Sequence, residues 1–176
     1  TYDIDRTQAH VGWQGRFEGW RGRVQAYRSE IDIVNSASNG VTATRPQNLL
    51  DEVIDGHATV KLGGHQVTFG GEWRDETLTN AGLTTGRDSA THKALFVQDE
   101  VALGSSLMLT GGLRADNHEL FGSEVSPRAY LVWEASPALV VKGGFGHAFK
   151  APTLKQISPN YVGAEGPHTF KGNAHV

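Results

Sequence analysis

The chain has 176 residues, with 22 Gly, no Cys and a formal net charge of −3. The absence of Cys excludes a disulfide framework and a thiolate metal site. Because Lys and Arg (16) are fewer than Asp and Glu (19), a strongly basic nucleic-acid-binding surface is also excluded. Mean hydropathy is −0.36, and no stretch approaches the run of about 18 apolar residues that a transmembrane helix needs.

Apolar and polar residues alternate over long stretches, which is typical of β-strands with one apolar and one polar face. The clearest example places Val67, Phe69 and Trp73 on one face, whereas Glu72 and Arg74 fall on the other. Tight turns alternate with longer polar loops between such stretches. We therefore predict eight strands, at residues 5–15, 20–34, 49–62, 66–79, 91–103, 107–120, 126–135 and 139–150.

The apolar face of this sheet could be buried against a second sheet in a soluble sandwich or in the lipid around a barrel. Long strands and heavily charged polar faces favour a barrel with a wet lumen. Aromatic residues also gather near the strand ends, where interfacial girdles lie; they are Trp13, Phe17, Trp20, Trp73, Trp133 and Phe149. The pattern predicts an all-β fold, an antiparallel up-and-down transmembrane β-barrel.

Three glycine pairs recur about six residues after a tight turn, at Gly70-Gly71, Gly111-Gly112 and Gly143-Gly144. They are expected at a similar depth on three strands that run the same way. We favour relief of crowding where the sheet bends. The alternative is the close approach of another group to the inner face.

Four segments in series resemble the barrel domain of TonB-dependent outer-membrane receptors. They are residues 96–100 (FVQDE), 109–116 (LTGGLRAD), 126–129 (SPRA) and 143–154 (GGFGHAFKAPTL). The run FKAPTLKQ at 149–156, with SPNY at 158–161, is most similar to the ferric-catecholate and colicin I receptor branch.

The resemblance implies a barrel of about 22 strands, closed by an N-terminal plug and energised by TonB through a short N-terminal box. We expect residues 1–176 to be part of that barrel domain, without the plug domain and the C-terminal strands. The implied function is uptake of a ferric siderophore across the Gram-negative outer membrane. From the pattern alone, a small structural or adhesive outer-membrane barrel without transport and a soluble β-sandwich binding domain remain alternatives.

The resemblance also implies the partners. These are a ferric siderophore, with the catecholate type favoured, the TonB complex through the missing N-terminal region, outer-membrane lipid, and colicins or phages that use such receptors. No cofactor is expected to bind directly, because iron would arrive as part of the ferric-siderophore ligand. No nucleic acid is expected.

Three cationic candidates for ligand binding fall on the polar, lumen-facing side of the strands. They are Arg74, Arg114 and Arg128, and such cations would attract an anionic siderophore. Inward acids such as Asp116 and Glu72 balance them. A structural role in ion pairs or plug contacts is therefore the favoured alternative for each single residue.

The long loop after residue 149 supplies three more candidates, Tyr161, His168 and Phe170. Aromatic and cationic side chains on an external loop suit a flat aromatic ligand, through stacking and cation–π contacts. The alternative is an ordinary surface loop.

The sequence offers no support for catalysis. It has no Gly-x-Ser-x-Gly elbow, no phosphate-binding glycine-rich loop and no Cys nucleophile. The adjacent acidic pairs, such as Asp75-Glu76, point to opposite faces of a strand and cannot form a catalytic dyad. The eight His lack the spacing of a compact metal site. We expect neither an enzyme nor a bound metal.

Overall fold

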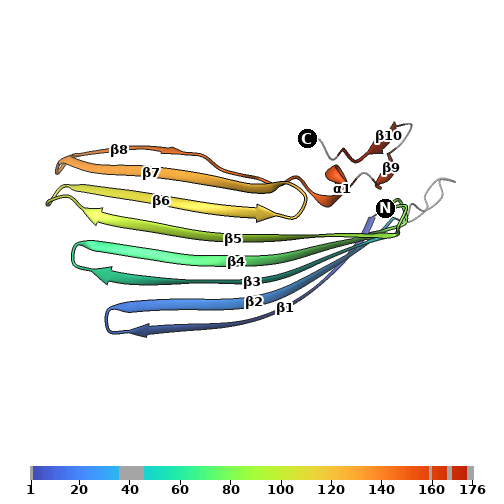
Figure 1. Ribbon diagram of the computed structural model, residues 1–176, viewed down its shortest axis with the longest axis horizontal. Helices are drawn as coiled ribbons and strands as arrows, with labels where there is room; N and C mark the ends of the chain where they lie inside the picture. The colour runs from blue at the N-terminus through green and yellow to red at the C-terminus, as the bar shows by residue number, and fades with distance from the viewer. Residues whose placement is uncertain (1, 36–45, 159, 166–167, 174–176) are drawn as a thin grey trace.

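The computed structural model describes residues 2–35, 46–158, 160–165 and 168–173. Its main element is one antiparallel sheet of eight strands in chain order (Figure 1). The strands are β1 (Tyr2–Phe17), β2 (Trp20–Asn35), β3 (Gln47–Leu62), β4 (His65–Asn80), β5 (Arg87–Ala102), β6 (Leu107–His118), β7 (Gly122–Ser136) and β8 (Leu139–Gly146). All eight predicted strands are therefore present, and the all-β, up-and-down prediction is confirmed.

Tight turns join β1 to β2, β3 to β4, β5 to β6 and β7 to β8 at one edge of the sheet, here called the turn edge. Gly19, Gly63 and Gly104 adopt positive φ angles of 80°, 62° and 84° in three of these turns. Glycine reaches this left-handed region without the steric cost that a Cβ imposes. The opposite edge, here called the loop edge, carries the β4–β5 connection (81–86) and the β6–β7 connection (119–121). The β6–β7 connection is a short turn and not the longer loop that the sequence predicts.

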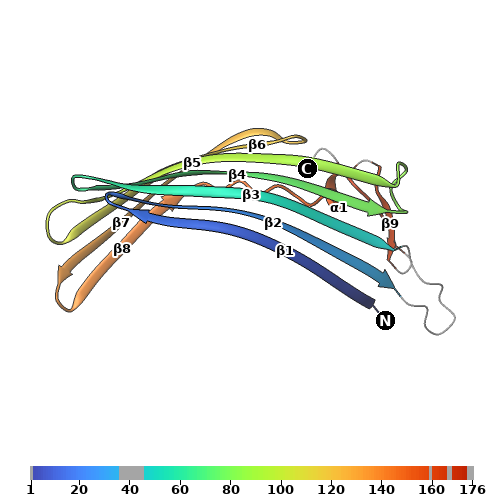
Figure 2. The ribbon, with the colours of Figure 1, turned by 90° about the horizontal axis from the view of Figure 1, so that it is seen from below.

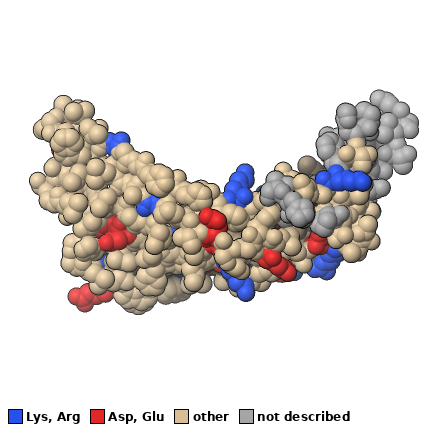
Figure 3. Space-filling view, turned by 45° about the horizontal axis from the view of Figure 1, so that its top comes forward, with Lys and Arg blue, Asp and Glu red and all other residues tan. Residues whose placement is uncertain are grey.

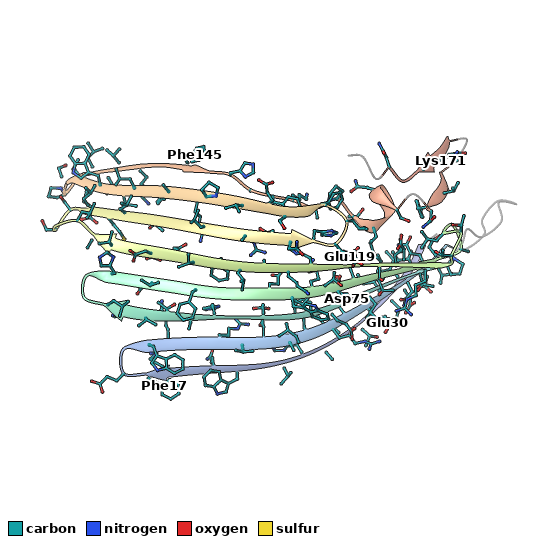
Figure 4. The ribbon with its side chains drawn as sticks, in the orientation of Figure 1. Phe17, Glu30, Asp75, Glu119, Phe145 and Lys171 are labelled. Carbon is teal, nitrogen blue, oxygen red and sulfur yellow. The ribbon has the colours of Figure 1, made fainter. Side chains whose placement is uncertain are left out.

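The two faces of the sheet differ in polarity. The register sets Ala58 beside Phe69, Phe69 beside Val97, and Val97 beside Leu113. This row belongs to a continuous apolar surface, which we call the outward face. Phe17 extends this face to the turn edge, and Phe145 lies on it near the end of β8 (Figure 4). In a barrel such a face meets lipid.

The strands continue past the length that a membrane requires. Each of β1 to β5 has 16 residues, whereas about 9–11 residues of a tilted strand cross the apolar core. Beyond Trp73 the outward face becomes polar. Figure 4 shows Glu30, Asp75 and Glu119 there, and Asp75 Oδ2 accepts a 3.1 Å hydrogen bond from Thr91 Oγ1. The loop-edge part of the sheet therefore lies outside the membrane-spanning stretch.

The sequence-based boundary of the last strand is wrong. The prediction ran to residue 150, but β8 ends at Gly146, and the chain then leaves the sheet. It forms a short helix, α1 (Leu154–Ile157), and a small hairpin of β9 (Val162–Glu165) and β10 (His168–Lys171). None of these elements was predicted. Pro152 cannot donate a ladder hydrogen bond, which agrees with the end of strand structure before it.

The described residues between 150 and 173, which we call the cap, pack on the inward face at the loop edge, beside β4 and β5 (Figures 1 and 2). Its anchor is Leu154, which is buried with three residues of the sheet and its loops: Leu78, Leu83 and Ala90. Backbone hydrogen bonds also link the cap to the β4–β5 loop. Val162 N donates to Gly82 O at 2.9 Å, and Thr84 N donates to Asn160 O at 3.2 Å.

Among the residues that the structure describes, no helix is long and apolar enough to cross a membrane.

Candidate functional site

The inward face carries a charge network centred on Asp116 of β6. Arg114 Nε donates hydrogen bonds of 3.0 and 3.1 Å to the two carboxylate oxygens of Asp116. His92 Nε2 lies 2.9 Å from Asp116 Oδ1, and His92 Nδ1 lies 3.8 Å from Glu72 Oε1. The Asp116 side chain is only 4% exposed, and a carboxylate so buried needs partners of this kind. Arg114 therefore has the ion-pair role that the sequence offered as an alternative.

A pocket of about 310 Å³ lies beside this network. Strands β5, β6 and β7 form its floor, and the chain that leaves β8 closes one side. The pocket combines aromatic, cationic, hydroxyl and carboxylate groups, which are provided by Phe96, Arg114, Asp116, Ser126, Arg128, His147 and Phe149. We call it the wall pocket.

Two glycines shape the floor of the wall pocket. A Cβ on Gly112 would lie 3.2 Å from Arg128 Nε, so the missing side chain lets Arg128 lie flat across β6 and donate a hydrogen bond to Gln98. A Cβ on Gly70 would lie 2.8 Å from Phe96 Cζ. At both positions a neighbouring side chain approaches the glycine closely. Close approach of another group was the less favoured of the two explanations of the glycine pairs.

The six candidate residues are not gathered in one place. Arg114 and Arg128 both line the wall pocket. Arg74 also points inward, but it lies nearer the loop edge, beside Glu76, and its buried Nε has no hydrogen-bond partner within the described part of the chain. Tyr161 belongs to the cap, where its backbone forms an isolated bridge with Leu83.

The remaining two candidates, His168 and Phe170, lie on β10. Their side chains lie outside the described part of the structure. All six residues therefore keep their binding roles as hypotheses.

Sequence reasoning assigned Phe149 to the outward aromatic girdle, and this was wrong. Because β8 ends early, Phe149 turns to the inward side, with its ring centroid 6.5 Å from that of His92. Phe96 and Ser126 were missed as site residues. Alternation would have placed both on the inward face, but it could not show that they meet.

The inward charges do not form a single-sign patch. Arg114 is paired with Asp116, and Arg74 lies beside Glu76. On the side that Figure 3 draws, Lys and Arg side chains are likewise interspersed with Asp and Glu side chains. In the described residues, no group of three or more His, Asp and Glu side chains could hold a metal ion.

Glu76 lies under the cap, beyond the membrane-spanning stretch of β4. Burial, reinforced by the nearby Asp51 carboxylate, raises the pKa of Glu76 above its ordinary value, although a hydrogen bond from Leu154 N–H and the charge of Arg74 oppose the shift. The folded protein therefore binds a proton at Glu76 more tightly than the unfolded chain does.

We expect the folded state to lose stability as the pH rises above 4.5, the ordinary pKa of this carboxyl, through its raised pKa in the folded protein. Glu76→Gln should remove this pH dependence, because an amide does not titrate. The amide oxygen still accepts the Leu154 hydrogen bond, so the variant keeps that contact. The free energy of unfolding of the full-length receptor, measured in denaturant across this pH range, shows the effect. If the free energy of unfolding changed with pH equally in the wild type and in Glu76→Gln, the expectation would be contradicted.

Comparison with known proteins decides the family. A family model described as TonB dependent receptor-like, beta-barrel, matches residues 1–174. The chain belongs to this family. The resemblance predicted from the sequence and the barrel fold class are thereby confirmed.

Relatives of this TonB-dependent receptor barrel come from several Gram-negative bacteria. The iron-regulated outer membrane virulence protein of Vibrio cholerae is 33% identical over 134 residues, covering 74% of this chain and 21% of the relative. The ferric enterobactin receptor PirA of Pseudomonas aeruginosa is 35% identical over 115 residues, covering 54% of this chain and 16% of the relative.

The solved structure of the siderophore receptor PirA from Pseudomonas aeruginosa superposes with a TM-score of 0.88 at 28% identity. The match covers 99% of this chain and 33% of that structure. The chain thus spans between a sixth and a third of the proteins that it matches. The predicted location, the Gram-negative outer membrane, is confirmed. The relatives give no support to a soluble β-sandwich or a small barrel without transport.

Proposed function

We propose that this chain is part of an outer-membrane receptor that takes up a ferric siderophore with energy from TonB. The observation that carries the proposal is the match of residues 1–174 to the family barrel, together with relatives that are named as ferric enterobactin and siderophore receptors. A catecholate siderophore is the favoured substrate. The role is binding and transport, not catalysis, and iron enters as part of the ligand.

The geometry supports different roles for the two faces of the barrel wall. The outward face offers lipid a continuous apolar surface, and the inward face offers a polar lumen. Arg128 and the aromatic side chains of the wall pocket would attract and hold an anionic ligand after it enters from the loop edge. Tyr161 and the other cap candidates, His168 and Phe170, would contact the ligand first.

We also propose that residues 1–176 are a continuous stretch of the barrel wall in a larger receptor. In the described residues, β1 and β8 each pair with only one strand of this sheet. The unpaired backbone N–H and C=O groups along the outer side of each of these two strands require a further strand in lipid. The plug, the TonB contact and any colicin or phage contact would involve other parts of that receptor.

We expect cells that express the full-length receptor under iron limitation, and that lack their own catecholate receptors, to accumulate radioactive iron from a ferric catecholate. Uptake should stop in an isogenic strain without TonB, because the family depends on that energy source. A ferric hydroxamate and cobalamin serve as comparison substrates. Uptake of neither siderophore class, with the receptor present in the outer membrane, would refute the proposed function.

A further inference from the structure

Ser126 of β7 has an unusual position for a hydroxyl group. The residue is only 8% exposed, it lines the wall pocket, and its Oγ has no hydrogen-bond partner within the described part of the chain. Buried polar side chains almost always have a partner, because burial removes the water around an unpaired group without a compensating hydrogen bond. An orphan hydroxyl facing a pocket therefore points to a group that enters the pocket.

The charged groups around the pocket define what that group can be. Asp116 is already paired with Arg114 and His92, and His147 Nδ1 lies 3.8 Å from Glu124 Oε1 on the same β7 strand as Ser126. Arg128 has only the neutral side-chain oxygen of Gln98 as a hydrogen-bond acceptor among the described contacts. Its positive charge is therefore left for a ligand, and the pocket favours one negative charge.

The uncharged walls define the shape of the ligand. Phe96 and Phe149 both line the pocket, and aromatic rings prefer other planar rings in stacked or edge-to-face contact. The volume of about 310 Å³ lies at the lower end of the range for drug-sized ligands, about 300–1,000 Å³. The pocket therefore has room for one ring-bearing arm and not for a whole three-armed chelate.

We propose that the wall pocket is a subsite for a single aromatic arm that carries an anionic oxygen, such as one catecholate or hydroxybenzoyl unit. Ser126 Oγ–H donates a hydrogen bond to that oxygen, the Arg128 guanidinium neutralises its charge, and the ring lies between Phe96 and Phe149. This proposal rests on the proposed function, since it takes the ligand to be a siderophore. It adds the part of the siderophore that this stretch of wall recognises.

The test compares two variants of the purified full-length receptor. In Ser126→Ala the orphan hydroxyl is removed, and in Ser123→Ala a hydroxyl is removed from the same strand, where Ser123 Oγ accepts a 2.8 Å hydrogen bond from Asn117 Nδ2 on the opposite face. The probes are a ferric tricatecholate, iron-free 2,3-dihydroxybenzoate and a ferric hydroxamate, which has no aromatic arm. Affinity for each probe and the free energy of unfolding are measured.

Ser126→Ala should weaken binding of both aromatic probes about tenfold, as expected for loss of a hydrogen bond to a charged oxygen. It should leave hydroxamate binding and stability unchanged, because an unpaired hydroxyl stabilises nothing in the free protein. Arg128→Gln should weaken the aromatic probes further and make their binding less dependent on salt. Ser123→Ala should bind all three probes as the wild type does.

The outcomes separate the two proposals. If the wild type binds the tricatecholate and Ser126→Ala binds it equally well, the subsite is wrong and the proposed function stands. If Ser126→Ala lowers stability without changing affinity, the hydroxyl contacts another part of the receptor, such as its plug, and the subsite is again wrong. If the wild type binds no siderophore, the proposed function fails and the subsite fails with it.

Discussion

Leu78→Ala should lower the free energy of opening the cap by about 2–5 kcal/mol, the usual cost of truncating a fully buried leucine. Leu78 is 0% exposed and packs with Leu83, Ala90 and Leu154. These residues join β4, the β4–β5 loop, β5 and the cap. Truncation would leave a cavity that these short segments can fill only by moving, so the cap should open more often.

Native-state hydrogen exchange of the full-length receptor measures this effect at the Val162 and Thr84 amides, which link the cap to the β4–β5 loop. The matched control is Leu120→Ala. Leu120 is also at the loop edge but is 50% exposed, so its truncation should cost less than about 1 kcal/mol. Equal losses in the two variants would show that the buried cluster does not hold the cap.

Gly70→Ala should destabilise the barrel wall by about 1–3 kcal/mol, the range for overpacking a filled site. The added Cβ would collide with the carbonyl oxygen of Gly56 and would lie 2.8 Å from His57 Cβ and from Phe96 Cζ. The Phe96 ring can rotate away, but the Gly56 backbone is held in the β3–β4 ladder. The strain therefore falls on the sheet.

Gly111→Ala is the matched control, because nothing lies within 4 Å of a Cβ built at that outward position. It should be neutral or slightly stabilising, since alanine restricts the unfolded chain more than glycine does. Denaturant unfolding of the full-length receptor in lipid vesicles compares the two variants. A loss of stability in Gly111→Ala as large as that in Gly70→Ala would mean that close contact is not the cause.

The eight strands could be predicted from the sequence because the alternation of polar and apolar residues is a local signal. Val67, Phe69 and Trp73 belong to one face regardless of which strand pairs with β4. Arg114 and Arg128 could be assigned to the lumen in the same way. Only the register of β6 and β7 brings these two side chains to one pocket.

The site itself could not be predicted in this way, because it depends on contacts between residues that are distant in sequence. Phe149 appeared to continue the apolar face of β8, and only the early end of that strand turns it toward His92. The space beside Gly112 becomes part of the site only because the register places Arg128 next to it. Whether Ser126 Oγ has a hydrogen-bond partner within the described part of the chain depends on the neighbours that the folded pocket places around it.

The sequence by itself determined the strands, the two faces and the family motifs, since each depends on side-chain character along a single extended segment. The tertiary structure decided which inward side chains satisfy one another and which remain free. Asp116 is matched by Arg114 and His92, whereas Ser126 Oγ has no hydrogen-bond partner within the described part of the chain. The difference arises because hydrogen bonds and burial depend on neighbours across the sheet, and those neighbours are fixed by register and by the path of the cap.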